Sequence, residues 1–439
     1  MLELYRAALS EGGKGSMGNE SNKPLNIAVS PVSIALALAV VSGGAAGNTL
    51  TEILNVLRLP ADLAIAHSSL TSLRRNLLGG PTSASTSDSV AADVRRLPAD
   101  LAVARSSLTS LRRKFNRLEG HTSASTSDSA AAVKVQIATG LWVTDQLPLK
   151  KEYEDHVAMY EGRVVPADFV GAASQVREEI NRWVRNQTSG KIQEIVPQGL
   201  LNEASVFVLV NTLYFKGLWQ KVFRKECTHP GNFMIPAKGG GLETVSVPMM
   251  RNKGSYSVGN HNGFRILRLP YRVGGAEDRR QLAMYIFLPD EVDGLAKMEG
   301  SLTAELLEES FGNMYDSHLT TLLLPKFKVA SGLKLNQLLK DIGMKSAFDL
   351  EISDFSNLFD CQDRGICISD VLHDVCVEVD EHGTVAVAAT VVVMLAGCSR
   401  TPPPPNEFIV DHPFLFMIRE DRSGVALFLG RVVDPRPSD

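Results

Sequence analysis

The fold of this chain is decided by one stretch, GTVAVAATVVVML at residues 383–395. Its β-branched residues favour a strand. It is nevertheless framed by loop signals, because Glu381-His382 precedes it and a tetraproline at 402–405 holds the following chain extended. A strand-like segment in this setting is either an edge strand or a segment that enters a sheet in only one state.

The two faces of this segment differ in side-chain size. Successive side chains of a strand point to opposite faces. One parity carries only small side chains, which can slide between two strands and under covering layers without a clash. These are Thr384, Ala386, Ala388 and Thr390, whereas Val385, Val387 and Val391 lie on the other parity.

Several motifs point to a known family. The segment VEVDEHGT at 377–384, with the alanine-rich run after it, resembles the hinge of a serpin reactive-centre loop. Four other motifs occur in the order found in serpins: NTLYFKGLW at 211–219, VPMM at 247–250, LPKF at 324–327 and DHPFLF at 411–416. The chain is identified as a member of the serpin family, most similar to the plant serpins, from about Asn26 to Pro435.

The resemblance implies an α+β fold with one serpin-like domain at 1–439. Its parts would be a large central mixed β-sheet, further sheets, about eight to nine helices and an exposed reactive-centre loop at 383–405. The order of elements agrees, because helical patterns come early and strand patterns late. We expect helices from Ser30-Pro31 onward and at 49–57, 174–187, 302–310 and 333–342. We expect strands at 135–143, 205–214, 282–289, 408–410, 414–419 and 425–433.

The resemblance also implies roles for individual residues. The reactive bond would join Gly397 and Cys398, since in the family it lies about fourteen residues beyond the hinge glycine; Arg400-Thr401 is the alternative bond. Trp219 would mark the breach at the top of the main sheet. The hinge would comprise Glu381, Gly383, Thr384, Ala386, Ala388, Ala389 and Thr390, and the shutter Ser30, Ser33 and His373. Both serines can also be interpreted as a helix cap with its backbone bonding.

Composition argues against several classes of function and partner. A net charge of −4 and a pI near 6.2 give no reason to expect nucleic acid as a partner. The five cysteines form no CxxC pair, which favours a reducing compartment and argues against zinc; we expect no metal and no cofactor. The N-terminus lacks a signal-peptide pattern, and we expect no membrane association. A cytoplasmic or nucleocytoplasmic monomer is predicted, and an extracellular location without a recognisable signal peptide stays open.

Residues 59–129 contain a tandem duplication. LPADLA at 59–64 recurs at 97–102, SSLTSLRR at 68–75 recurs at 106–113, and TSASTSDS at 82–89 recurs at 122–129. One pair of units is too few for a solenoid. We interpret the segment as a duplication inside one domain, which explains why the chain is longer than the usual serpin.

The motifs favour an inhibitor over an enzyme. Ser30, Asp370 and His373 could be assembled into a hydrolase triad, but the chain has no GxSxG elbow and no HExxH motif. The resemblance implies a suicide-substrate inhibitor of serine or cysteine endopeptidases, whose cleaved loop inserts into the main sheet. The alternative is a non-inhibitory serpin-fold binding or storage protein. Val385 and Val387 favour that alternative, because inhibitory plant serpins usually carry Glu and Ala there.

Overall fold

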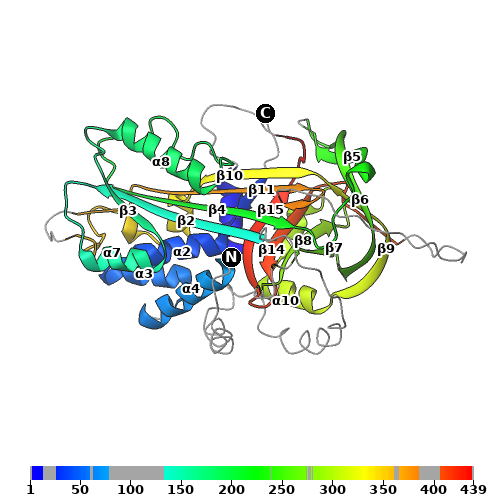
Figure 1. Ribbon diagram of the computed structural model, residues 1–439, viewed down its shortest axis with the longest axis horizontal. Helices are drawn as coiled ribbons and strands as arrows, with labels where there is room; N and C mark the ends of the chain where they lie inside the picture. Colours follow the sequence, from blue (N-terminus) through cyan, green and yellow to red (C-terminus); the bar gives the residue numbers. More distant parts are fainter. Residues whose placement is uncertain are drawn as a thin grey trace, which may run out of the picture.

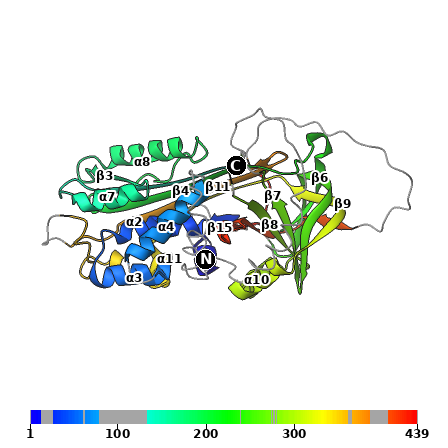
Figure 2. The same cartoon turned by 60° about the horizontal axis from the view of Figure 1, so that its bottom comes forward.

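The structure is a computed structural model that describes residues 2–12, 26–59, 63–78, 133–237, 239–272, 274, 278, 280–359, 365–384 and 406–437. The predicted α+β fold is confirmed, because these residues form nine α-helices and two β-sheets. Figures 1 and 2 show the sheets side by side along the long axis, with most helices at the end that holds the six-stranded sheet. Among the described helices, none is long and apolar enough to cross a membrane.

The six-stranded sheet positions the site. Its order is β10-β11-β12-β4-β2-β3. The strands are β2 (Val133–Thr144), β3 (Arg163–Ala167), β4 (Phe207–Leu218), β10 (Phe327–Lys334), β11 (Asp370–Asp380) and β12 (Gly383–Thr384). β4 and β11 are parallel and pair directly from Val208–Asp370 to Tyr214–Cys376, and we call this line of contact the seam. β12 lies between them at one end of the seam, antiparallel to both.

The nine-stranded sheet follows the order β1-β15-β14-β8-β7-β6-β9-β13, and β5 pairs with β6. Its strands are β1 (Ile27–Val29), β5 (His229–Pro236), β6 (Leu242–His261), β7 (Phe264–Pro270), β8 (Leu282–Pro289), β9 (Tyr315–Pro325), β13 (Glu407–Ile409), β14 (Phe414–Glu420) and β15 (Val425–Val432). β8 and β14 are buried at every position, as expected for strands with both faces covered. β1 pairs with β15, so segments from opposite ends of the chain close this sheet.

The helices of the described residues are α1 (Leu2–Gly12), α2 (Pro31–Ser42), α3 (Gly47–Leu57), α4 (Leu63–Leu78), α7 (Lys151–Met159), α8 (Ala173–Gln187), α9 (Leu295–Ser301), α10 (Ala304–Gly312) and α11 (Asn336–Asp341). Two short 3₁₀ helices lie at Lys225–Cys227 and Ser346–Phe348. All twelve residues of α2 are buried, because a helix that is apolar all round must be enclosed. It packs against β4 and β15 and so holds the two sheets together.

The two faces of the seam meet different parts of the protein. Because side chains alternate along a strand, one row of β4 and β11 joins the main core, which includes α2. The other row packs with α8, which Figure 2 shows lying over the sheet. We call these rows the core face and the outer face. The core face carries Leu209, Leu213, Val371 and Val375, and the outer face carries Val208, Val210, Leu372 and Cys376.

Several element boundaries differ from the sequence prediction, and two helices show the physical reason. The helix expected at 302–310 is α10, which begins two residues later at Ala304, because Leu302 caps the end of α9, a helix that was not predicted. α9 has only seven residues and includes Gly300, so it leaves a weak periodic signal. The helix expected from Leu333 starts at Asn336, because Leu333 and Lys334 continue β10 and pair with His373 and Leu372.

The first copy of the duplicated segment supplies α4. Its buried side chains lie on one face and include Leu70, Leu73 and Leu77, while Arg74 pairs with Glu161 at 2.8 Å. The second copy, at 97–129, lies outside the described residues. Its sequence repeats the buried leucines as Leu108 and Leu111, although His67 becomes Arg105.

Deleting Pro60 to Leu97 is therefore expected to leave a folded protein. The deletion joins Leu59 to Pro98, so the second copy enters the α4 position in the same register. Leu108 and Leu111 are then available for burial, and the apolar Phe115 takes the place of Leu77. Urea unfolding followed by circular dichroism checks this. Loss of a cooperative transition in the deleted protein, but not in the full chain, would show that both copies are structural.

Candidate functional site

The start of the predicted hinge lies inside the six-stranded sheet. Gly383 is opposite Asp380 of β11 and Leu218 of β4, and Thr384 follows in the same ladders. The sequence left open an edge strand or a segment that enters a sheet in only one state; residues 383–384 lie between two strands and so are not at an edge. Gly383 and Thr384, which were predicted to start the exposed loop, are therefore part of a strand. Several predicted residues lie outside the described part of the chain: Ala386, Ala388, Ala389, Thr390, Gly397, Cys398, Arg400 and Thr401.

Gly383 is required at this position by its surroundings. Its φ is +147°, a conformation that side-chain-bearing residues rarely adopt. A Cβ on residue 383 would lie 2.1 Å from the carbonyl oxygen of Gly217 and 2.8 Å from the Cα of Leu218. The backbone of β12 consequently fits between its neighbours only because residue 383 has no side chain.

Trp219, the predicted breach residue, holds the turn that leads into β12. It is buried, and its indole stacks on Tyr271 with ring centroids 4.7 Å apart. Its Nε1–H donates to the carbonyl oxygen of Asp380 at 3.0 Å, and its backbone N–H donates to the carbonyl oxygen of His382 at 2.8 Å. Trp219, the first residue after β4, thus fixes both ends of the turn between β11 and β12.

Glu381 anchors the same turn to Lys326, the residue between β9 and β10. Its side chain is buried, and Lys326 Nζ donates to Glu381 Oε2 at 3.0 Å. Its backbone carbonyl accepts from the N–H of Phe223 at 2.8 Å. Burial alone would raise the pKa of Glu381, but hydrogen bonds, including the one from Lys326, hold it below its ordinary value.

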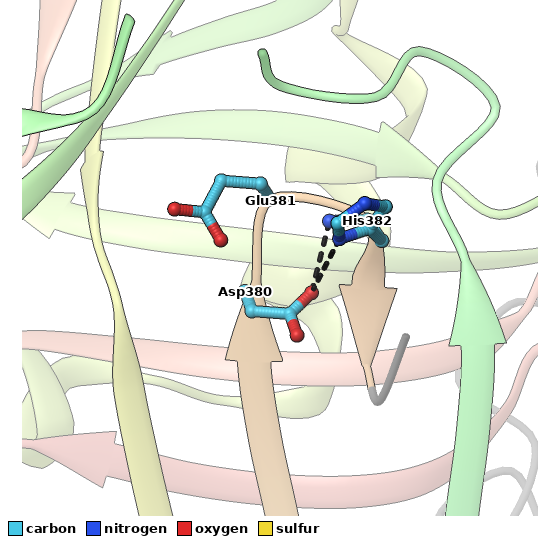
Figure 3. A group of neighbouring side chains, drawn as sticks. All are labelled: Asp380, Glu381 and His382. Atoms are coloured by element: carbon cyan, nitrogen blue, oxygen red, sulfur yellow. Dashed lines mark hydrogen bonds and ion pairs between the residues drawn. The ribbon is translucent and has the colours of Figure 1, made fainter. Parts of the chain in front are cut away.

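Asp380, Glu381 and His382 form a group with ligand atoms within 4.8 Å of one another, the kind of cluster that can hold a cation (Figure 3). Asp380 Oδ1 already accepts from the backbone N–H groups of His382 (2.9 Å) and Gly383 (3.2 Å). The Glu381 carboxylate is engaged by Lys326. Because both carboxylates already serve protein donors, we assign this group to formation of the turn.

His373, the predicted shutter residue, links β11 to its neighbours through a buried hydrogen-bond chain. The backbone N–H of Ser30 donates to His373 Nε2 at 3.1 Å, so the ring proton is on Nδ1. Nδ1–H donates to Asn211 Oδ1 at 2.8 Å, and Asn211 Nδ2–H donates to Thr139 Oγ1 at 3.1 Å. Burial lowers the pKa of His373 to about 3, which keeps the ring neutral. The chain connects α2, β11, β4 and β2 on the core face.

Asn211 and Thr139 were not among the predicted site residues. One sequence feature could have pointed to them: Asn211 is a single amide within the apolar run at 205–214. Buried polar groups almost always have hydrogen-bond partners, so a lone amide in a buried strand indicates a cross-strand bond. The sequence could not name His373 as that partner, because the two residues are 162 positions apart.

The two predicted serines act mainly as a helix cap. Ser30 Oγ accepts from the N–H of Ser33, and Ser33 Oγ donates to the carbonyl oxygen of Ser30, both at 3.3 Å. Ser30 reaches the seam through its backbone N–H. Asp370 does not join these groups, because its carboxylate pairs with Lys334 Nζ at 2.5 Å. No arrangement of a hydrolase triad therefore forms from Ser30, Asp370 and His373.

Comparisons with known proteins agree with this geometry. A family model described as serpin, or serine protease inhibitor, matches residues 16–435. Serpin-Z2A of Triticum aestivum is 38% identical over 306 residues, which are 69% of this chain and 75% of that protein. The Arabidopsis AtSerpin1 structure, in a native stressed conformation, is 25% identical with a TM-score of 0.73 and covers 99% of this chain and 95% of its own. Human thyroxine-binding globulin shares the fold at 23% identity, a TM-score of 0.75, and coverage of 99% and 96%. The chain therefore belongs to the serpin family, the family of serine protease inhibitors.

Proposed function

We propose that this protein is a single-use inhibitor of serine or cysteine endopeptidases. In this proposal a protease cleaves the reactive-centre loop and is held as an acyl-enzyme while the segment after Thr384 inserts along the seam. The observation that carries the proposal is β12, because two residues of the segment already pair with both β11 and β4. Insertion then continues by repeating the same backbone pairing, one residue after another.

The register of β12 predicts where each later residue would lie. Six positions beyond Thr384, Thr390 would come opposite His373 and Asn211, whose side chains bond across the seam. A hydroxyl both donates and accepts, so Thr390 can satisfy the groups that separate when the seam opens. Positions 384, 386, 388 and 390 would share the core face, where close packing favours small side chains.

This mechanism requires the inserted form to be the more stable one. An inserted strand gains backbone pairing on two sides, while opening the seam breaks only the pairing between β4 and β11. Small side chains on the core face add apolar burial. We therefore expect cleavage of the loop to raise the midpoint of thermal unfolding.

Two measurements test the proposal together. Incubation with a panel of serine and cysteine proteases, followed by a denaturing gel, is expected to reveal a covalent complex, and thermal unfolding is expected to shift upward after loop cleavage. Thr384→Arg should remove both results, because it puts a guanidinium on the core-face row without a partner. Thr384→Ser is the matched control. A cleaved loop with an unchanged midpoint and no complex would contradict inhibition by insertion.

The position of the cleaved bond shows which cut in the loop leads to inhibition. We expect the productive cut at Gly397-Cys398 and a substrate-like cut at Arg400-Thr401, since the longer tether slows insertion and lets the acyl-enzyme hydrolyse first. Mass spectrometry distinguishes them, because the released C-terminal peptide has 42 residues from Cys398 and 39 residues from Thr401. A stable complex whose released peptide begins at Thr401 would reverse this assignment.

The second candidate is a non-inhibitory serpin-fold binding or storage protein. It is favoured by Val385 and Val387 in the hinge, where inhibitory plant serpins usually carry Glu and Ala. Thyroxine-binding globulin illustrates a binding protein on the same fold. In the register of β12 both valines would lie on the outer face, opposite Glu378 and Cys376, and so would not occupy the close-packed core face. Inhibition remains the better-supported function for that reason.

A further inference from the structure

An ion pair crosses the seam on the outer face of the six-stranded sheet. Lys191 Nζ donates to Glu378 Oε2 at 2.6 Å, and the two side chains are 30% and 35% exposed. Lys191 lies in the segment that follows α8 and leads into β4, whereas Glu378 belongs to β11. The pair therefore ties the chain that continues into β4 to the strand on the opposite side of the seam.

The surroundings hold this pair in place. Ile192, the residue after Lys191, is buried in the outer-face cluster that contains Leu372 and Cys376 of β11. Glu378 has the same parity as Leu372 and Cys376, so it also lies on the outer face. The hydrogen bond to Glu378 is the largest cause that raises the pKa of Lys191. Figure 2 shows α8 and its connections covering this side of the sheet.

The pair stands at the first step of insertion. β12 ends at Thr384, opposite Val379 and Gly217. The next position, 385, would fall opposite Glu378 and Lys216 in the same register. Here β11 and β4 converge toward the Cys376–Tyr214 pair, and a new strand would separate them by about 4.8 Å more. His373 and Asn211 are reached only five positions later.

We propose that Lys191 is a positioning residue that restrains entry of the reactive-centre loop through its bond to Glu378. The bond resists separation of β11 from the α8–β4 side of the seam before the shutter residues are reached. It releases when the incoming strand pushes the two sides apart. This inference rests on the proposed insertion mechanism.

The test uses a probe that needs no target protease. A fluorescent synthetic peptide with the sequence of residues 385–395 is incubated with the uncleaved protein, and its annealing rate is followed. Lys191→Met is expected to accelerate annealing about fivefold. A solvent-accessible ion pair contributes at most about 1 kcal/mol, and a barrier lowered by that amount raises the rate about fivefold, since about 1.36 kcal/mol is a factor of ten. Lys191→Arg and the charge-swapped Lys191→Glu/Glu378→Lys protein are expected to anneal at the wild-type rate. Lys151→Met, which removes two exposed ion pairs on α7, is the matched control and should leave the annealing rate unchanged.

The outcomes separate this inference from the function on which it rests. An unchanged rate in Lys191→Met, or a fast rate that the charge swap does not restore, overturns the role of the ion pair while insertion itself stands. A wild-type protein that takes up no peptide and gains no thermal stability after cleavage overturns insertion and this inference with it. A faster Lys191→Met with a restored charge-swapped protein supports the restraint.

Discussion

Gly383→Val is expected to reduce the fraction of protease trapped as a covalent complex by about tenfold to a hundredfold, and to turn the protein into a substrate. A β-branched residue at a φ of +147° costs on the order of 1–3 kcal/mol in backbone strain alone. Its Cβ would also collide with the carbonyl oxygen of Gly217. The backbone of β12 must then leave the sheet, so the pairing that starts insertion is lost. A densitometric gel of complex against cleaved protein measures the effect.

A matched glycine isolates the effect of β12. Gly239 has no atom within 4 Å of a Cβ built on it and lies in the turn between β5 and β6, so Gly239→Val is expected to inhibit like the unmodified protein. Thermal unfolding of both variants before cleavage shows whether each one folds. A folded Gly383→Val protein that still traps protease at the original ratio would mean that β12 is not where insertion starts.

Asp374→Asn is expected to stabilise the native protein, and to do so more strongly as the pH rises. Asp374 follows His373 on β11 and is 7% exposed, and burial raises the pKa of its carboxyl to about 8. An unfolded aspartate has a pKa of about 3.9, so the folded state holds a proton that the unfolded state has released. The contribution of Asp374 to stability is therefore greatest below about pH 4 and declines as the pH rises toward 8.

The amide of asparagine has no proton to lose in this pH range, so the fall in unfolding free energy with rising pH should disappear in the variant. At pH 7 the gain in unfolding free energy is expected to be on the order of 2–4 kcal/mol, and at pH 5 only about 1 kcal/mol. Urea unfolding at pH 5, 7 and 8 measures the difference. Asp293→Asn, at an exposed position, is the control. Two unfolding curves that stay parallel across this range would show that Asp374 does not titrate in its buried site.

The same substitution connects stability to inhibition. Asp374 lies at the seam, paired in register with Thr212 of β4 and Gly332 of β10. A native state stabilised there has less free energy to release when the loop inserts. We therefore expect Asp374→Asn to insert more slowly, so that the acyl-enzyme is hydrolysed more often before it is trapped.

The sequence by itself determined the elements that local patterns specify. Ser30-Pro31 followed by an apolar run predicted the start and the burial of α2, because capping and helix enclosure depend on neighbouring residues. The apolar run at 205–214 predicted most of β4 for the same reason. The motifs that resemble serpins then gave the family, which the family model at 16–435 confirms.

Only the tertiary structure decided what happens along the seam. Gly383 belongs to a strand because β4 and β11 diverge beyond Cys376 and leave backbone groups for it to pair with. The bonds His373–Asn211 and Lys191–Glu378 join residues 162 and 187 positions apart. Periodicity reports which face of its own strand a residue occupies, but not which strand lies beside it. Register between distant strands, set by the packing of the whole sheet, is what brought these partners together.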